Sequence, residues 1–566
     1  AESDPEAESD PEAESDPAPE ADPESESEAD PDPESDPEPE SESESEAAPE
    51  SDPASDSDPA PESAPARESA PDTDEAPTGA EDPARRFTRS GYLFGRLLGL
   101  AFLAAFVSFH VQLEGLVGER GIAPALDRFA RLEAAGGSFA DAPTLAWLFG
   151  AGDAGLHTIC ALGELASLAL LVGALPGPSA LLAALLYLSV VNVGGPFMAF
   201  QWDALLVEAG VLAALFCPWR LFHRPRDAVE PVPLARWAVY LLVFRLMFLS
   251  GVVKLRSRDE AWASLSALEY HYWTQPLPNP VSWFVHQLPD GLHAASTFLV
   301  FVIELALPFA IFFGRWGRRA AFAGLASLML LIGLTGNYGF FNLLALALCL
   351  PLLDDEAVAR LTPRRWRAPR GGLARPPVWR RWPVRVLAGA LVALGAMQTL
   401  VGLGAGPLVP QRVLSPLNAV TPYRLVNGYG LFAVMTTERR EIRIEGSMDG
   451  LEWRTYRFAY KPGDPAELPP EAWLHMPRLD WQMWFAALGG FRQSPWLAHL
   501  MRRLLEAEPD VLDLLEDDPF DGLAPRYVRA RVHDYRFGDW TLLREEGRWW
   551  EVEPLGPYSP TFTRRR

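Results

Sequence analysis

The residues best suited to chemistry are concentrated in positions 254–284, KLRSRDEAWASLSALEYHYWTQPLPNPVSWF, between two long apolar segments. Lys254 is one of only two lysines in the chain, and a partly buried ammonium can act as a base or hold an anionic group. His271 is its candidate partner. The structural alternative is a helix-end lysine whose ammonium extends to the membrane interface. Candidate site residues here are Lys254, Arg256, Trp262, Tyr270, His271, Trp273, Gln275 and Asn279.

A second group of candidates lies in QWDALLVEAG, residues 201–210, and comprises Gln201, Trp202, Asp203 and Glu208. A carboxylate that enters a membrane helix is costly unless it is paired, so acids here indicate either function or a structural partner. The structural alternative is that Asp203 caps a helix and that Glu208 forms an ion pair with an arginine such as Arg245. Asp203 is also a second candidate partner for Lys254.

Further candidates on the same predicted face are Asn337 and Asn342, which flank a short turn, and Asp480, Trp481 and Trp484 in the C-terminal part. The asparagines have a plain structural alternative, because amides often cap helix ends. Residues 270–280 contain three alternating prolines, which predicts a non-helical, extended segment that serves as a lipid anchor or a recognition surface. No zinc, phosphate-loop, nucleotide-fold or G-x-S-x-G pattern is present, and the three cysteines have no paired spacing. We therefore expect no cofactor and no metal.

The composition divides the chain into two unlike parts. Residues 1–82 hold 33 acidic residues and one basic residue, so the other 42 acidic and 48 basic residues give the remainder a net charge of +6. A proline-rich acidic stretch without apolar periodicity cannot offset its ordering entropy, which predicts a disordered tail over residues 1–84.

Nine apolar segments are predicted to be membrane helices. They cover about residues 91–111, 157–175, 179–194, 203–218, 234–253, 293–313, 320–336, 338–353 and 384–404. Arginine clusters precede or follow helices one, four, six and eight, and the positive-inside rule then places the tail in the cytoplasm. Everything beyond about residue 405 is predicted to be extracytoplasmic.

The periodicity changes in the C-terminal part. Residues 441–445 and 453–458 alternate with period two around a turn, which predicts a β-hairpin, and 527–537 and 548–552 read as further strands. Residues 480–488 and 496–505 have a helical pattern. The predicted fold is an α-helical multi-pass membrane domain of about nine helices (85–405) plus a β-rich, sandwich-like C-terminal domain with two helices (406–566).

Several ordered blocks together resemble the lipase maturation factor family of multi-pass membrane proteins. They are QWDALLVEAG (201–210), KLRSRDEAW (254–262), LEYHYWTQPLPNPVSWF (268–284), GNYGFFNLL (336–344), TPYRLVNGYGLFAVMTTERREIRIEGSMDGLEW (421–453), YKPGD (460–464), PRLDWQMWFAAL (477–488) and YVRARVHDYRF (527–537). The resemblance spans about residues 87–560 and implies a membrane-resident, chaperone-like factor for the folding and assembly of secreted lipases. It implies no catalytic residues.

The resulting hypothesis is a maturation factor that is more a chaperone than an enzyme. Its expected partners are the lipid bilayer and secreted proteins such as lipases, and we expect it to bind no nucleic acid. Its aromatic residues would hold the client. The competing hypothesis is a membrane enzyme that modifies a lipid or protein carboxyl group with Lys254 as the base. A short pattern, Lys254, Asp259 and Trp262, is similar to the transmembrane domain of vitamin K-dependent carboxylases, where the lysine acts as a base. The arginine bias and the tail favour a bacterial cell membrane; a eukaryotic chain would lie in the endoplasmic reticulum.

Overall fold

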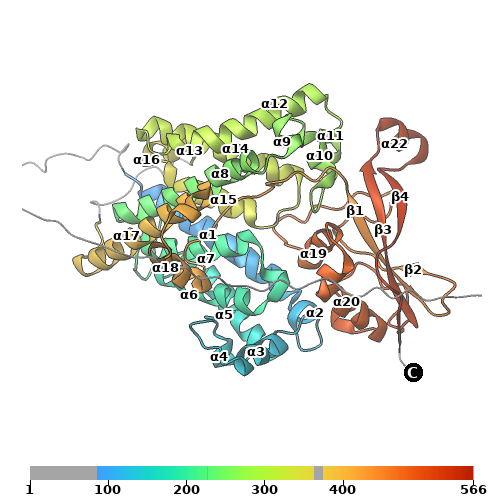
Figure 1. Ribbon diagram of the computed structural model, residues 1–566. Helices are drawn as coiled ribbons and strands as arrows, with labels where there is room; N and C mark the ends of the chain where they lie inside the picture. The colour runs from blue at the N-terminus through green and yellow to red at the C-terminus, as the bar shows by residue number, and fades with distance from the viewer. Residues whose placement is uncertain (1–85, 226, 363–373, 565–566) are drawn as a thin grey trace, which may run out of the picture. The chain divides into compact units, whose positions relative to one another are not determined.

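The computed structural model describes residues 86–225, 227–362 and 374–564. The tail predicted over residues 1–84 lies outside this range. In Figure 1 the helices of the first part lead to a C-terminal region that contains the strands. The α-helices before that region are Thr88–His110 (α1), Leu113–Val117 (α2), Ala125–Ala134 (α3), Ala146–Phe149 (α4), Asp153–Val172 (α5), Pro176–Val193 (α6), Gln201–Phe216 (α7), Pro233–Arg256 (α8), Glu260–Ala263 (α9), Ala267–Thr274 (α10), Pro280–His286 (α11), Asp290–Phe301 (α12), Leu307–Ala310 (α13), Gly314–Thr335 (α14), Phe341–Cys349 (α15), Asp355–Leu361 (α16), Val378–Leu400 (α17) and Gln411–Val420 (α18).

Within the described residues, seven helical segments are long and apolar enough to cross a membrane. They are Thr88–His110, Asp153–Val172, Pro176–Val193, Pro233–Arg256, Asp290–Ala310, Gly314–Thr335 and Val378–Leu408. All nine predicted segments are helical, but two of them fall short of that length: α7 and the segment Phe341–Leu352. At 1.5 Å per residue, the 16 residues of α7 extend only about 24 Å. The predicted number of nine therefore gives way to seven full-length candidate spans.

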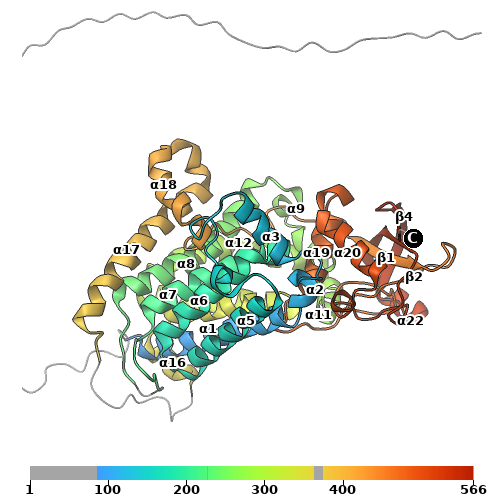
Figure 2. The same ribbon diagram turned by 90° about the horizontal axis from the view of Figure 1, so that it is seen from below.

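Small residues allow the closest helix packing. A side chain at Gly99 of α1 would lie 2.6 Å from the backbone nitrogen of Leu171, and one at Gly163 of α5 would lie 2.3 Å from the ring of Phe106. Close approach of backbones at small residues is a common basis of helix association in membranes. At the other side of the bundle, α17 packs on α8. Figure 2 shows α18 next to the end of α17, away from the C-terminal sheet.

The predicted non-helical run over residues 270–280 is wrong for its first half. Helix α10 continues through Thr274, and only the residues between it and α11 are extended. A proline disfavours the helical conformation of the residue before it, so Pro276 acts on Gln275 and not on earlier residues. Pro280 occupies the first turn of α11, where its missing N–H costs nothing, and Asn279 caps that helix by accepting from the Ser282 N–H at 2.9 Å.

One antiparallel sheet forms the C-terminal region, so the predicted sandwich of two sheets is not present in the described residues. Its order is β2-β1-β3-β4, with β5 also paired to β3. The strands are Arg440–Ser447 (β1), Arg454–Thr455 (β2), Tyr527–Phe537 (β3), Trp550–Pro557 (β4) and Phe562–Thr563 (β5). The helices are Arg478–Ala487 (α19), Pro495–Glu506 (α20), Pro509–Leu512 (α21) and Trp540–Glu546 (α22), so the two predicted helices are confirmed.

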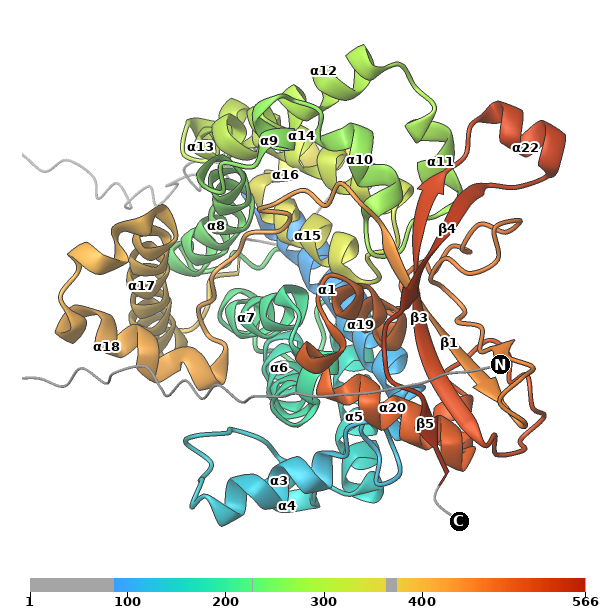
Figure 3. The same cartoon turned by 45° about the vertical axis from the view of Figure 1, so that its right-hand side comes forward.

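The sheet is covered on the side toward the helical bundle. Figure 3 shows α19 and α20 between the sheet and the ends of the long helices, and α19 packs on β1 while α20 packs on β3. Ile442 and Ile444 of β1 and Val528 and Ala530 of β3 are fully buried beneath them. Helices take the place that a second sheet would occupy in a sandwich, because each amphipathic helix covers an apolar sheet face equally well.

Candidate functional site

Asp203 is at the centre of a fully buried ion pair between the helical bundle and the C-terminal region. Arg478 of α19 donates to both carboxylate oxygens of Asp203, at 2.9 and 2.8 Å, and the Tyr187 hydroxyl donates to the same carboxylate at 2.5 Å. The guanidinium also donates to the carbonyl of Phe197 at 2.6 Å. Both charged side chains are 0% exposed. Asp203 is therefore no helix cap, because its carboxylate is used entirely in holding α19.

Glu208, one turn further along α7, has the predicted ion pair with Arg245 of α8. Its second oxygen accepts the Tyr429 hydroxyl at 2.7 Å and both the backbone and side-chain N–H groups of Asn427, at 3.1 and 3.0 Å. Arg245 in turn donates to the Asn427 carbonyl at 3.0 Å. The membrane-level acid and base thus also fix the segment that leads into β1.

Two further candidate residues, Gln201 and Asn337, form hydrogen bonds with backbone groups of the C-terminal region. Gln201 exchanges two hydrogen bonds with the backbone of Gly430, at 3.2 and 3.1 Å. Asn337 donates to Pro470 at 3.0 Å and accepts from Ala472 at 2.8 Å, so it does not cap a helix. These bonds satisfy backbone groups outside the sheet, of which the Ala472 N–H is buried. Asn342 lies within α15 and is buried.

The extended residues 275–279 and the end of α10 are held by Arg439, which is only 1% exposed. Its guanidinium donates to the carbonyls of Trp273 and Pro276, each at 2.9 Å, and to that of Gln275. Glu441 compensates its charge at 2.6 Å and also pairs with Lys461 at 2.8 Å. Lys461, the second lysine of the chain, therefore forms a buried ion pair inside the C-terminal region.

Helix α19 carries the remaining selected residues. The Asp480 carboxylate accepts the backbone N–H groups of Tyr460 and Lys461, both at 2.9 Å, and burial raises its pKa to about 6. The Trp484 indole donates to the Thr274 carbonyl at 2.9 Å. Trp481 packs edge-on against Trp202, with ring centroids 4.8 Å apart. These contacts attach α19 to α7 and α10.

The Lys254 side chain is buried and paired, whereas the snorkelling alternative predicts an ammonium extended toward water. Its ammonium is 5% exposed and bonds both oxygens of Glu304, at 3.0 and 2.8 Å, and the Ser250 carbonyl at 3.2 Å. Glu304 lies in a π-helical turn, Val302–Ala306, inside the Asp290–Ala310 span. Sequence reasoning missed this acid, although an isolated carboxylate in an apolar span is itself a signal that a partner exists.

His271 lines the same interior cavity of about 370 Å³ as Lys254 and Glu304. Its Nε2 lies 3.5 Å from the Tyr338 hydroxyl, and burial, with a smaller effect of the Lys254 charge, lowers its pKa to about 4. The imidazole is therefore neutral at physiological pH. Asp203 is not part of this cavity, so of the two predicted partners of Lys254 only His271 lies in the same chamber.

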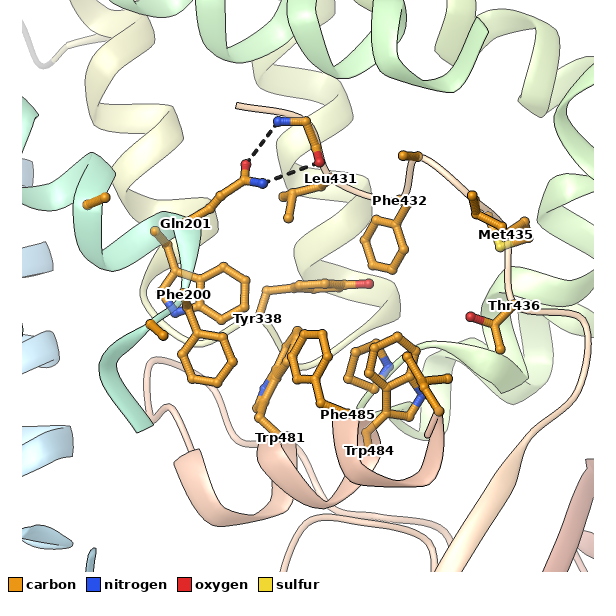
Figure 4. A pocket seen from close by; sticks show the side chains of 18 of the residues that line it. Phe200, Gln201, Tyr338, Leu431, Phe432, Met435, Thr436, Trp481, Trp484 and Phe485 are labelled. Carbon is orange, nitrogen blue, oxygen red and sulfur yellow. Dashed lines mark hydrogen bonds between the residues drawn. The ribbon is translucent and has the colours of Figure 1, made fainter. Parts of the chain in front are cut away.

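A separate open groove of about 1000 Å³ runs along the junction between helices and the C-terminal region. Figure 4 shows Phe200, Tyr338, Phe432, Trp481, Trp484 and Phe485 converging on it, with the two bonds of Gln201 at its upper edge. Its exposed apolar groups are Phe485 at 43%, Leu488 at 52% and Val434 at 63%. Charged side chains lining it include Arg424, Glu438 and Arg440.

The structure therefore sorts the selected residues into three places. Gln201, Trp202, Trp481 and Trp484 line the groove, whereas Lys254, Trp262 and His271 line the interior cavity. A third set is buried and forms hydrogen bonds between elements: Asp203, Glu208, Gln275, Asn279, Asn337 and Asp480. Nearby, Trp273 is buried and Tyr270 is half-buried. The guanidinium of Arg256 lies against Gly404. In the described residues, no three His, Cys, Asp or Glu side chains are arranged to hold a metal ion.

These features define a class: a multi-pass membrane protein whose C-terminal sheet region is attached to one end of the helices by a buried ion pair and by hydrogen bonds. The comparisons agree. A family model described as the lipase maturation factor transmembrane domain matches residues 88–360, and one described as the lipase maturation factor C-terminal domain matches residues 425–560.

Individual relatives cover most of the chain. Lipase maturation factor 2 of Gallus gallus is 36% identical over 600 residues, covering 85% of this chain and 82% of the relative. Lipase maturation factor 2 of Homo sapiens is 35% identical, covering 83% and 82%, and lipase maturation factor 1 of Bos taurus is 33% identical, covering 83% and 88%. No solved structure matches. The chain belongs to the lipase maturation factor family.

Proposed function

We propose that this protein is a membrane-resident maturation factor that holds exported proteins, lipases among them, while they fold and assemble. The observation that carries the proposal is the open groove at the junction of helices and sheet region. Family membership supports the same role, because the relatives are named for lipase maturation.

The chemistry of the groove fits a protein client. Its lining combines aromatic and apolar side chains with the charged residues Arg424, Glu438 and Arg440. Protein interfaces have this composition, with an apolar centre rich in aromatic groups and a polar rim. Trp481 and Trp484 are only 2% and 8% exposed, so Phe485, Leu488 and Val434 supply the surface that a client would touch. The buried tryptophans hold that surface rigid.

We propose further that the groove faces the extracytoplasmic side. At the beginning of α1, Arg89 bonds Asp355, and at the beginning of α14, Arg319 bonds Asp354 at 2.6 Å. At the opposite ends of these helices, Ser108 bonds Met476 and Asn337 bonds Ala472. Arg89 and Arg319 therefore lie at the end of these helices that is opposite to the C-terminal region, and the positive-inside rule assigns their end to the cytoplasm. A bacterial cell membrane is the compartment that we propose.

A client-yield experiment tests the role. Phe485→Glu places a charge in the apolar groove, and Leu451→Glu is the matched control because Leu451 is 84% exposed and is not among the groove residues. Each variant is co-expressed with a secreted dimeric lipase in cells that lack another maturation factor. A hot-spot loss of about 1.4 kcal/mol corresponds to a tenfold loss of client binding, so active secreted lipase should fall about tenfold with Phe485→Glu only. Equal yields from wild type and Phe485→Glu would refute the groove as the client site.

A second candidate function is an enzyme that modifies a lipid or protein carboxyl group with Lys254 as base. One observation favours it: Lys254 and His271 line the same cavity. The contacts of the ammonium oppose it, because its bonds to the two Glu304 oxygens and to the Ser250 carbonyl occupy the group that would have to meet a substrate. Lys254→Arg separates the two functions, since arginine keeps the charge and does not act as a base near neutral pH. Unchanged client yield with this variant supports the maturation factor; accumulation of an unmodified lipid or protein supports the enzyme.

A further inference from the structure

The interior cavity is amphipathic. Its volume of about 370 Å³ falls in the range of small-molecule sites. Its long wall is aliphatic and comes from α8, α12 and α14, with Leu246, Leu328 and Ile332 as examples. Its polar end holds Lys254, Glu304 and His271. A mainly apolar lining that also carries Lys254, Glu304, His271 and the hydroxyls of Ser296, Thr335 and Tyr338 matches an amphiphile with a hydrocarbon chain.

The polar end is electrically neutral and its ammonium is saturated. Lys254 has three N–H donors, and its bonds go to the two oxygens of Glu304 and to the Ser250 carbonyl. An anionic head group entering here would find no free ammonium donor and would lie beside the Glu304 carboxylate. Burying an unpaired charge at membrane level is costly, so this end excludes phosphates and free carboxylates. It admits an uncharged ester or hydroxyl.

The cavity lies directly behind a surface that the bilayer covers. Leu299 of α12 and Leu331 of α14 both line it, yet they are 52% and 56% exposed on candidate membrane spans. Both residues line the cavity and also carry exposed surface on candidate spans, so the cavity lies close to the surface that lipid would cover.

The backbone beside the polar end is specialised as well. Glu304 lies in the π-helical turn, and π-helical turns occur frequently at functional sites. Gly251 of α8 allows this turn to approach, since a Cβ at Gly251 would lie 2.8 Å from the Leu305 side chain and 3.0 Å from the Glu304 Cβ. The carboxylate is thus directed at Lys254 by a local departure from α-helical geometry.

We propose that this cavity binds an acyl chain of an uncharged membrane lipid of the acylglycerol class, with its ester or hydroxyl end beside Lys254, Glu304 and His271. This inference does not depend on the client groove. It assigns a lipid site to the membrane part of the chain, reached sideways from the bilayer.

Neighbouring residues of α14 provide a matched pair of variants. Met329 lines the cavity and is 4% exposed, whereas Leu330 is 53% exposed and is not among the cavity residues. The full chain is purified in mild detergent, and bound lipid is extracted and quantified by mass spectrometry. We expect neutral acyl lipid in about stoichiometric amount with wild type and Leu330→Trp, and at least tenfold less with Met329→Trp. Equal lipid in both variants would overturn the proposal.

Photolabelling of the wild type makes the test independent of how well the variant folds. A diazirine-bearing diacylglycerol should label peptides of α8 and α14, and unlabelled diacylglycerol should compete. The corresponding phosphatidic acid, with the same chains and an anionic head group, should label at least tenfold less. Equal labelling by the two probes would contradict the charge argument, and labelling confined to outward-facing residues would show annular lipid only and refute the site.

Discussion

Replacing Arg478 by methionine should remove the fully buried ion pair that connects the C-terminal region to the helices. The change removes two bonds to Asp203, one to the Phe197 carbonyl and one to the Tyr187 hydroxyl, and leaves a carboxylate that is 0% exposed with only the Tyr187 hydroxyl as donor. Breaking a buried pair by removing one partner typically costs about 3–5 kcal/mol. We therefore expect Arg478→Met to lower the free energy of unfolding by about 4 kcal/mol.

The double variant decides whether the pair acts as a unit. Asp203→Leu alone should cost about 3 kcal/mol, because the guanidinium keeps its bond to Phe197. With both changes no charge is left buried, and the unpaired Tyr187 hydroxyl and Phe197 carbonyl cost about 2 kcal/mol each, so the double variant should lose about 4 kcal/mol. The coupling free energy should thus be about 3 kcal/mol, well above the deviation expected for independent sites.

Unfolding in detergent, followed by tryptophan fluorescence, measures these values. The exposed pair Arg457–Glu467, whose side chains are 42% and 56% exposed, is the control and should show about 1 kcal/mol or less. If the costs of Arg478→Met and Asp203→Leu add in the double variant, the pair is not the connection that its geometry indicates, and the reasoning fails.

Three further predictions follow from the same contacts. Arg245→Gln leaves Glu208 without its buried cation and should cost about 3–5 kcal/mol of unfolding free energy, measured by the same denaturation. His271 has its pKa lowered to about 4, so the folded state excludes a proton that the unfolded chain binds below about 6.5; melting temperature should fall as pH drops from 6.5 toward 4, and less steeply in His271→Gln. A chain ending after α18 loses Arg478 as the partner of Asp203, Asn427 as a partner of Glu208, and the backbone partners of Gln201 and Asn337. At about 1–3 kcal/mol for each unpaired group, it should be degraded in cells unless the C-terminal region is co-expressed.

Local patterns were sufficient for much of the fold. Apolar runs of membrane length located the helices, and period-two alternation located β1 and β3, because both signals depend only on neighbouring residues. The pairing of Glu208 with Arg245 was predictable for a related reason: two opposite charges in adjacent membrane helices have few other ways to be compensated. The proline run was read too broadly, since its effect begins at Gln275 and does not extend to the preceding residues.

Long-range partners were not predictable from the same signals. Arg478 is 275 residues away from Asp203, and no periodicity relates the two positions. Glu304 carried a usable signal, an acid alone in an apolar span, which should have been matched with the helix-end Lys254. The groove and the interior cavity could not be predicted from the sequence, because their walls combine residues of helices far apart in the chain with residues of the loop before β1.

The residues that first suggested chemistry acquire a different meaning once their partners are known. A buried acid, amide or arginine at a membrane surface is compatible with catalysis, but Asp203, Glu208 and Asn337 use their oxygens on the arginines, hydroxyls and backbone groups that join the two regions. Because these polar groups are bonded within the protein, the groove has mainly apolar walls and a fixed shape. The function that we propose depends on surfaces and needs no nucleophile. Tyr338, Leu431 and Phe432 line both the groove and the interior cavity, so a client outside and a lipid inside would affect one another through these side chains.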